Sequence, residues 1–169
     1  MQTPLFLRFI NNVATGDEIC RALYSIAERN SDTATMEIVG RGVPYDLEPF
    51  REEFKIMASV VAEDSGAINT AIISYLNEYM SVGLIEFENG SGSKNIERWV
   101  GVASEDSPWP EALICYNFSC YLKAQGVRDK TMDFKQCRTC KTFFDHKGPH
   151  AVYCSDMCKS KRGSQDASY

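Results

Sequence analysis

Residues 137–158 read CRTCKTFFDHKGPHAVYCSDMC, in which two cysteine pairs, Cys137 with Cys140 and Cys154 with Cys158, are separated by thirteen residues. When two cysteines are separated by two residues, their sulfurs can face a single point. A second pair of cysteines on another element then completes a tetrahedral cage for Zn²⁺. Four unrelated buried thiols, or two disulfides, are the alternative interpretation. Because such paired spacing rarely arises by accident, the sequence predicts one Zn²⁺ bound by these four cysteines.

Two histidines, His146 and His150, lie between the cysteine pairs, and either of them can replace a cysteine as a metal ligand. Their i, i+4 spacing would place both on one face of a helix. The sequence Lys147-Gly148-Pro149 between them disfavours a helix. The four-cysteine set is therefore favoured, and a histidine ligand stays open.

The residues around the cysteines predict a treble-clef-like finger. Phe143 and Phe144, which follow Cys140, indicate a short β-hairpin with an aromatic ring packed beneath the metal. Ser155 is a typical N-cap residue and would begin a helix that carries Cys158 in its first turn. The expected order is a hairpin with two ligands, a loop, and a helix start with two more.

Composition limits the class of protein. Of the 169 residues, 44% are hydrophobic, which is enough for a globular core. No run approaches the roughly 18 to 20 apolar residues of a membrane helix, and the start lacks the basic and apolar regions of a signal peptide. Seven cysteines, an odd count, are typical of a reducing compartment. We expect a cytoplasmic protein without a membrane partner.

The charge of the chain is divided between its two ends. Residues 1–120 contain 8 Lys or Arg and 18 Asp or Glu, a net charge of −10, whereas residues 121–169 contain 10 and 5, a net charge of +5. A basic end on an acidic body is typical of nucleic-acid contact, and a solvated basic surface is the plainer alternative. The candidate nucleic-acid contacts are the basic residues of the finger: Arg138, Lys141, Lys147, Lys159, Lys161 and Arg162.

Helical periodicity dominates the part of the chain before the finger. Apolar residues recur at three- and four-residue spacing in four segments. These predicted helices cover residues 17–29, 47–62, 67–82 and 111–125. Asp17 and Asp46 are the predicted caps of the first two helices, and Gly126 is the predicted end of the fourth.

Short strands are predicted in two places. Residues 84–88 and 96–100 flank a polar, glycine-rich loop and predict a hairpin, and residues 35–43 predict a further short strand. The expected fold is mainly α with a small β-hairpin, in two domains with separate cores. The predicted domains are a helical domain over 1–130 with the hairpin near 84–100, a four-cysteine zinc finger over 131–163, and a flexible tail over 164–169.

Catalytic motifs are missing from the sequence of the helical part. Both histidines lie in the finger, so no Cys-His or Ser-His-Asp arrangement can form elsewhere, and no glycine-rich phosphate-binding motif is present. Cys20, Cys115 and Cys120 lie on apolar helical segments and are predicted to be buried core thiols. We therefore expect that the protein is not an enzyme.

The finger resembles that of the CGNR-type zinc-finger proteins, which runs C-x-x-C, an aromatic residue, a variable loop, W/Y-C-S, and a further cysteine before basic residues. The matching residues here are Cys137, Cys140, Phe143, Phe144, Tyr153-Cys154-Ser155 and Cys158-Lys159-Ser160-Lys161-Arg162. The CGNR tetrapeptide itself is replaced by Cys158-Lys-Ser-Lys. The opening Leu5-Phe-Leu-Arg-Phe-Ile-Asn-Asn-Val13 is similar to the L-x-F-x-N-T-V start of the helical, ABATE-like domain of those proteins. The resemblance implies a stress-responsive bacterial transcription regulator.

Two classes of function follow. In the first, a zinc-binding transcription regulator contacts nucleic acid, with DNA favoured, through its basic finger, while the helical body senses a signal or forms a homodimer. In the second, zinc staples a protein-interaction or adaptor module whose acidic body binds a protein partner, without nucleic-acid binding. An enzyme with a catalytic zinc would need an open coordination position, which a four-cysteine cage does not supply.

Overall fold

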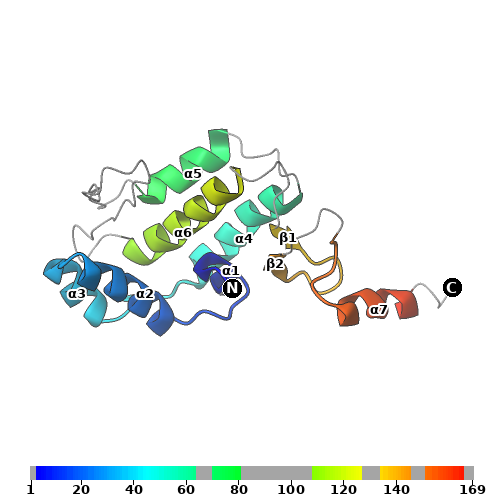
Figure 1. The fold of residues 1–169 in the computed structure, drawn as a ribbon, viewed down its shortest axis with the longest axis horizontal. Helices are drawn as coiled ribbons and strands as arrows, with labels where there is room; N and C mark the ends of the chain where they lie inside the picture. Colours follow the sequence, from blue (N-terminus) through cyan, green and yellow to red (C-terminus); the bar gives the residue numbers. More distant parts are fainter. Residues whose placement is uncertain (1–2, 64–69, 81–107, 127–133, 146–150, 166–169) are drawn as a thin grey trace.

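The computed structural model of the chain describes residues 3–63, 70–80, 108–126, 134–145 and 151–165 (Figure 1). These residues form a mainly helical fold with one small antiparallel sheet, so the predicted fold class is confirmed. The elements in chain order are α1 (Leu5–Ile10), α2 (Gly16–Arg29), α3 (Thr33–Gly40), α4 (Glu48–Glu63), α5 (Thr70–Met80), α6 (Trp109–Gly126), β1 (Phe134–Gln136), β2 (Phe143–Asp145) and α7 (Asp156–Gln165). Among the described residues, no helix is both long and apolar enough to cross a membrane.

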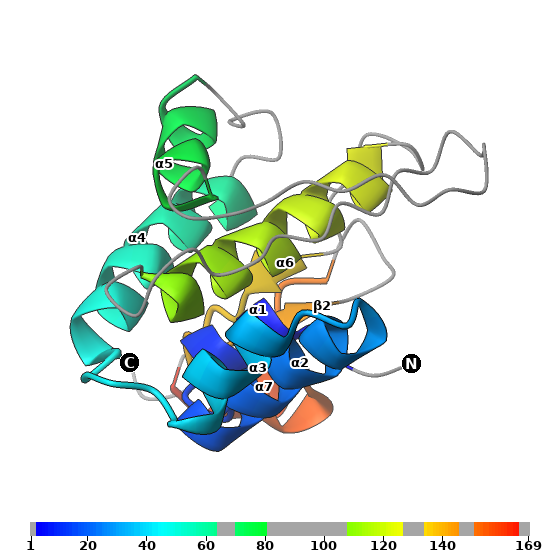
Figure 2. The same cartoon turned by 90° about the vertical axis from the view of Figure 1, so that its left-hand side faces the viewer.

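The core of the helical body forms where α1 meets α4 and α6. The apolar residues Phe6, Leu7, Phe9 and Ile10 of α1 are at most 2% exposed. The ring of Phe6 lies 4.8 Å from that of Phe118 on α6. In Figure 2, α6 runs diagonally across the body, with α4 and α5 on one side and α1, α2 and α3 on the other. Periodicity did not predict α1, because a six-residue helix that is apolar at almost every position has no amphipathic pattern.

Helix α2 begins one residue before the predicted start and has a different cap. Thr15, rather than Asp17, is the N-cap residue: its hydroxyl accepts a hydrogen bond from the Glu18 N–H at 3.3 Å. The Glu18 carboxylate in turn accepts one from the Thr15 N–H at 3.1 Å, which completes a capping box. Glu18 also forms an ion pair with Arg8 at 2.5 Å, so the cap of α2 is tied to α1.

Residues 35–43, which were predicted as a strand, lie mostly in helix α3, and that prediction is wrong. The carboxylate of Asp32 accepts hydrogen bonds from the Thr35 N–H at 3.0 Å and from the Thr35 hydroxyl at 2.5 Å, and so caps the helix. α3 packs against α2 and buries Val39. The cap and this packing outweigh the β propensity of the threonine, isoleucine and valine in the segment.

The other helices are close to their predicted bounds. α4 begins at Glu48, one residue after the predicted start, so Leu47 and not Asp46 precedes its first residue, although the Asp46 side chain still accepts a hydrogen bond from the Glu48 N–H at 3.0 Å. α5 lies inside the predicted range 67–82, and α6 begins at Trp109 with Pro110 in its first turn and includes Gly126. The hairpin that was predicted near 84–100 lies outside the described residues.

The hairpin of β1 and β2 packs against the helical body. Its register pairs Phe134 with Asp145 and Gln136 with Phe143. Phe143 is 4% exposed and belongs to the same hydrophobic cluster as the helices. The expectation of separate cores is therefore wrong, because the aromatic ring that was predicted to lie beneath the metal also fills the core of the body. Figure 1 shows α7 extending from the hairpin away from that body.

Candidate metal centre

The first cysteine pair lies on the turn of the β1–β2 hairpin. Cys137 directly follows β1, and its N–H donates to the carbonyl of Thr142 at 2.8 Å, while its carbonyl accepts from the Lys141 N–H at 3.0 Å. Lys141 has a φ of 59°, a left-handed conformation that turns the chain sharply after Cys140. The tight turn places both sulfurs on the same side, as the two-residue spacing predicted.

The second pair lies at the start of α7. Cys154 precedes the cap residue Ser155, whose hydroxyl accepts a hydrogen bond from the Cys158 N–H at 3.3 Å, as predicted. The Thr139 hydroxyl donates to the Cys158 carbonyl at 2.9 Å, so the hairpin turn is joined directly to the helix. α7 continues to Gln165, two residues beyond the predicted end of the finger at 163.

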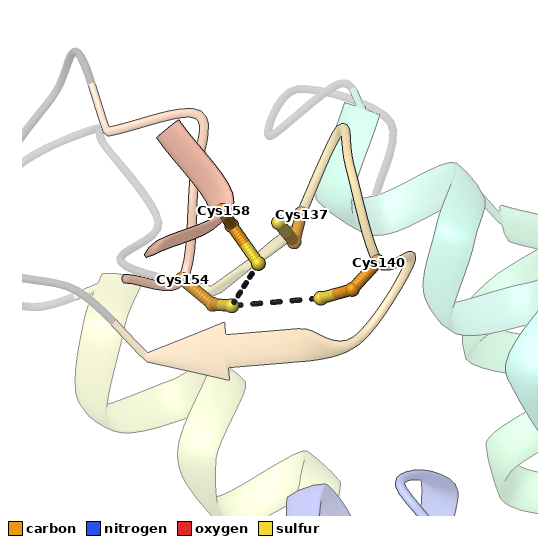
Figure 3. Close-up of side chains that lie close together, drawn as sticks. All are labelled: Cys137, Cys140, Cys154 and Cys158. Atoms are coloured by element: carbon orange, nitrogen blue, oxygen red, sulfur yellow. Dashed lines mark hydrogen bonds between the residues drawn. The ribbon is translucent and has the colours of Figure 1, made fainter. Parts of the chain in front are cut away.

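The four sulfurs gather at one point. All four Sγ atoms lie within 4.8 Å of one another. The distance from Cys140 to Cys154 is 3.5 Å and that from Cys154 to Cys158 is 3.6 Å (Figure 3). A tetrahedral ion with metal–sulfur bonds of about 2.3 Å requires sulfurs about 3.8 Å apart. The predicted cluster, completed by Cys137, therefore has the size and the ligands to hold a metal ion.

The thiols of the cluster ionise unequally. The hydroxyl of Thr142 beside Cys140 lowers the pKa of that thiol to about 6. Burial raises the pKa of Cys137, but backbone N–H groups outweigh it and hold that pKa below its usual value. Burial and the neighbouring thiols raise the pKa of Cys154 to about 12. Four close thiols cannot all ionise without a cation among them, and a bound metal ion supplies the missing positive charge.

Four of the six candidate nucleic-acid contacts have exposed side chains. Arg138 and Lys141 lie on the hairpin turn, and Lys159 and Lys161 lie on α7. Arg162 is also part of α7. Lys147 lies outside the described residues, as do the alternative ligands His146 and His150. The described finger residues 134–145 and 151–165 carry six Lys or Arg and two Asp.

The remaining cysteines differ in burial. Cys115 on α6 is fully buried, as predicted, and Cys20 on α2 is half-buried. Cys120 is exposed, so the prediction that it is a core thiol is wrong. Five residues correspond to about 140° around a helix with 3.6 residues per turn, so Cys120 faces away from the core that encloses Cys115.

Sequence reasoning missed the residues that join the cluster to the body. The Asn11 side chain donates to the Phe143 carbonyl at 2.7 Å and accepts from the Phe143 N–H at 2.9 Å. The Tyr121 hydroxyl donates to Asp145 at 2.8 Å. The only signal in the sequence was a polar residue at the end of an apolar run, since Asn11 is the C-cap of α1.

Comparisons of the chain with protein-family models, with curated proteins and with solved structures gave no match. The resemblance to CGNR-type zinc-finger proteins stays a prediction from the residues of the finger and of the opening segment. The geometry of the four-cysteine cluster is the firmest basis for a function.

Proposed function

We propose that the chain is a zinc-binding transcription regulator of the CGNR-like type, and that its finger contacts nucleic acid, in the first place DNA. The observation that carries the proposal is the cluster of four cysteine sulfurs within 4.8 Å of one another. On this account, residues 134–165 form a finger whose metal holds a basic surface in place, and the helical residues before it form the body of the regulator.

Zinc is the proposed metal because all four ligands are thiolates. Soft sulfur ligands in tetrahedral geometry favour Zn²⁺ or an iron–sulfur centre, and the pattern of a hairpin turn followed by a helix start is typical of a structural zinc site. The ion would join Cys137 and Cys140 on the hairpin to Cys154 and Cys158 beside α7. With four protein ligands, no coordination position is left for a substrate, so we propose a binding role rather than catalysis.

The exposed basic residues near the metal centre support contact with phosphates. Arg138 and Lys141 on the turn and Lys159 and Lys161 on α7 belong to segments joined by the Thr139 hydrogen bond. α7 extends away from the acidic helical body, which leaves this basic helix apart from the other helices (Figure 1). Contacts of this kind position a protein on the backbone without reading the base sequence.

The dependence of affinity on salt tests this proposal. Changing Lys159, Lys161 and Arg162 together to Ala should weaken binding similarly for all duplex sequences and leave the zinc content unchanged. The slope of log affinity against log salt is negative, and each lost phosphate contact should reduce its magnitude by about 0.9 on duplex DNA.

The matched control removes the same charge from the body, with Arg21, Arg29 and Arg41 changed together to Ala. This variant should keep the slope of the parent protein. If the parent shows no salt-dependent binding to any duplex or single strand at low ionic strength, the nucleic-acid proposal is wrong.

A specific surface favours the second candidate, a zinc-stapled adaptor that binds a protein. Ile56 is 71% exposed and Val60 is 46% exposed, and they lie one turn apart on α4. Glu52, Glu53 and Glu63 are also exposed and share this outer face. An exposed apolar pair between acidic side chains suits a basic amphipathic helix of a partner. Under this alternative, Ile56→Glu abolishes partner binding and the lysine variants have no effect.

A further inference from the structure

We infer that Cys140 and Cys154 are a peroxide-sensitive pair, and that their oxidation to a disulfide releases the metal ion from the finger. The inference rests on the proposed metal centre and adds a means of regulating it. Two observations carry it: the four cysteines differ in their access to solvent, and the most accessible one has a close sulfur neighbour.

The order of attack follows from burial. Cys137 is fully buried, Cys154 and Cys158 are half-buried, and Cys140 is exposed. The backbone of Cys137 is further fixed by its hydrogen bonds to Thr142 and Lys141. Oxidation of cysteine depends on thiolate character and on exposure, and metal-bound sulfurs have thiolate character. A small oxidant that arrives from solvent therefore meets the Cys140 sulfur first.

The partner of Cys140 follows from distance. Its Sγ lies 3.5 Å from that of Cys154, which itself lies 3.6 Å from that of Cys158 (Figure 3). A disulfide requires a separation of about 2.05 Å, so the two sulfurs must move about 1.5 Å closer together. Cys154 lies in the irregular segment 151–155 ahead of α7, which accepts a hydrogen bond from the Arg138 N–H at the Val152 carbonyl, two residues before Cys154. The backbone of Cys137 itself makes two hydrogen bonds within the turn, so Cys154 can move more easily than Cys137.

Formation of the Cys140–Cys154 disulfide consumes one molecule of hydrogen peroxide. The Cys140 thiolate attacks the O–O bond of hydrogen peroxide, which gives a sulfenic acid and releases hydroxide. The Cys154 thiolate then attacks the sulfenic sulfur, forms the S–S bond and expels a second hydroxide. Two electrons pass from the two sulfurs to the peroxide, and two protons from solvent convert the hydroxides to water.

Oxidation would change what holds the finger together. The centre would keep only two thiolates, those of Cys137 and Cys158, which is too few to retain a structural ion. The Cys140–Cys154 disulfide would then join the turn to the segment ahead of α7, beside the hydrogen bonds from the Arg138 N–H to the Val152 carbonyl at 3.1 Å and from the Thr139 hydroxyl to the Cys158 carbonyl, but no ion would hold Cys158 to Cys137. Contact of Lys159 and Lys161 with nucleic acid would weaken because the loss of the ion and the movement of Cys154 change the orientation of α7, and a dithiol reductant with zinc would restore it.

The test treats the zinc-loaded full chain with hydrogen peroxide and follows released zinc with a chromophoric chelator. We expect release of one zinc per chain, loss of two thiols of the centre for each zinc, counted apart from the thiol of Cys120, and a cross-linked peptide that joins Cys140 to Cys154. The exposed thiol of Cys120 serves as an internal reference, because its oxidation shows that the oxidant was active. Cys120→Ser, which lies outside the centre, should release zinc at the rate of the parent protein.

Cys140→His separates metal binding from oxidation, because an imidazole can ligate zinc but cannot form a disulfide. This variant should retain zinc and release it at least tenfold more slowly under peroxide. The inference would be overturned if the parent retained zinc while Cys120 was fully oxidised, or if the cross-link joined any other two cysteines. Neither result would contradict the proposed metal centre. A chain purified without zinc would refute the metal centre, and the inference with it.

Discussion

Asn11 is one of the residues whose side chains join the finger to the body, beside Tyr121. Its amide group exchanges hydrogen bonds of 2.7 and 2.9 Å with the backbone of Phe143, and so pairs the end of α1 with β2 as a neighbouring strand would. A net contribution of about 0.5 to 1.5 kcal/mol for each bond makes this pair a measurable part of the total stability. The position of the metal centre on the body therefore depends on a residue that is far from the cysteines in the sequence.

We predict that Asn11→Ala lowers the free energy of unfolding by about 2 kcal/mol, because it removes both bonds and leaves the backbone groups of Phe143 without these partners. Asn11→Asp should have an intermediate effect, since it keeps the acceptor and loses the donor. Urea unfolding measures both values. Asn77→Ala, an exposed change on α5, is the control. A loss of less than about 0.3 kcal/mol in Asn11→Ala would show that the pair does not hold the hairpin.

At this scale, sequence reasoning identified the residues whose chemistry is local. Cys137 and Cys140 could be predicted because the two-residue spacing itself places their sulfurs together, and Ser155 could be predicted because its partner is three residues away. Asn11 could not be predicted, because its partner lies 132 positions along the chain. Cys120 was assigned to the core from the apolar character of its helix, although its angle around that helix points it outward.

Helix α3 shows how a cap can decide the structure of an element. Thr35, Ile38 and Val39 favour a strand by propensity, and the segment was predicted as one. Asp32 instead satisfies the N–H and the hydroxyl of Thr35 at the helix start. The β1–β2 hairpin could be predicted from the cysteine spacing and the Phe143-Phe144 pair. Its packing on the helices could not, since that depends on contacts between segments far apart in sequence.

We expect Asp32→Ala to destabilise the protein by about 1 to 2 kcal/mol, because it removes the N-cap and the acceptor of the Thr35 hydroxyl bond. Asp32→Ser should recover most of the loss, since serine caps nearly as well as aspartate. The midpoint of urea unfolding reports both effects. Equal stability of Asp32→Ala and the parent protein would mean that packing on α2, not the cap, determines the helix.

At the scale of the whole molecule, the finger and the helical body share one core. Phe143 contributes to the cluster that also contains Phe6, Phe54 and Phe118. The sequence suggested two cores because its charge changes sign between the body and the finger, but charge describes the surface and not the interior. Metal binding at the hairpin turn should therefore stabilise the helices as well as the finger.

A strong chelator should lower the melting temperature of the helical signal. A metal ion that binds only the folded state, at a free concentration a thousand times its dissociation constant, stabilises that state by about 4 kcal/mol. Because Phe143 packs in the core of the body, this stabilisation should extend to the helices. Circular dichroism at 222 nm, with and without chelator, measures the shift. Phe143→Ala should cost about 3 to 5 kcal/mol and reduce the effect of the chelator. A helical melt that the chelator leaves unchanged would show that the two parts fold independently.

The content of zinc in the purified chain is the most direct test of the central claim, that Cys137, Cys140, Cys154 and Cys158 bind the metal. Elemental analysis should find one zinc per chain in the parent protein and in Cys115→Ser, and a protease-sensitive finger without zinc in Cys154→Ser, because binding energy is largely folding energy in so small a unit. A parent chain free of zinc, or an unchanged zinc content in Cys154→Ser, would contradict the account.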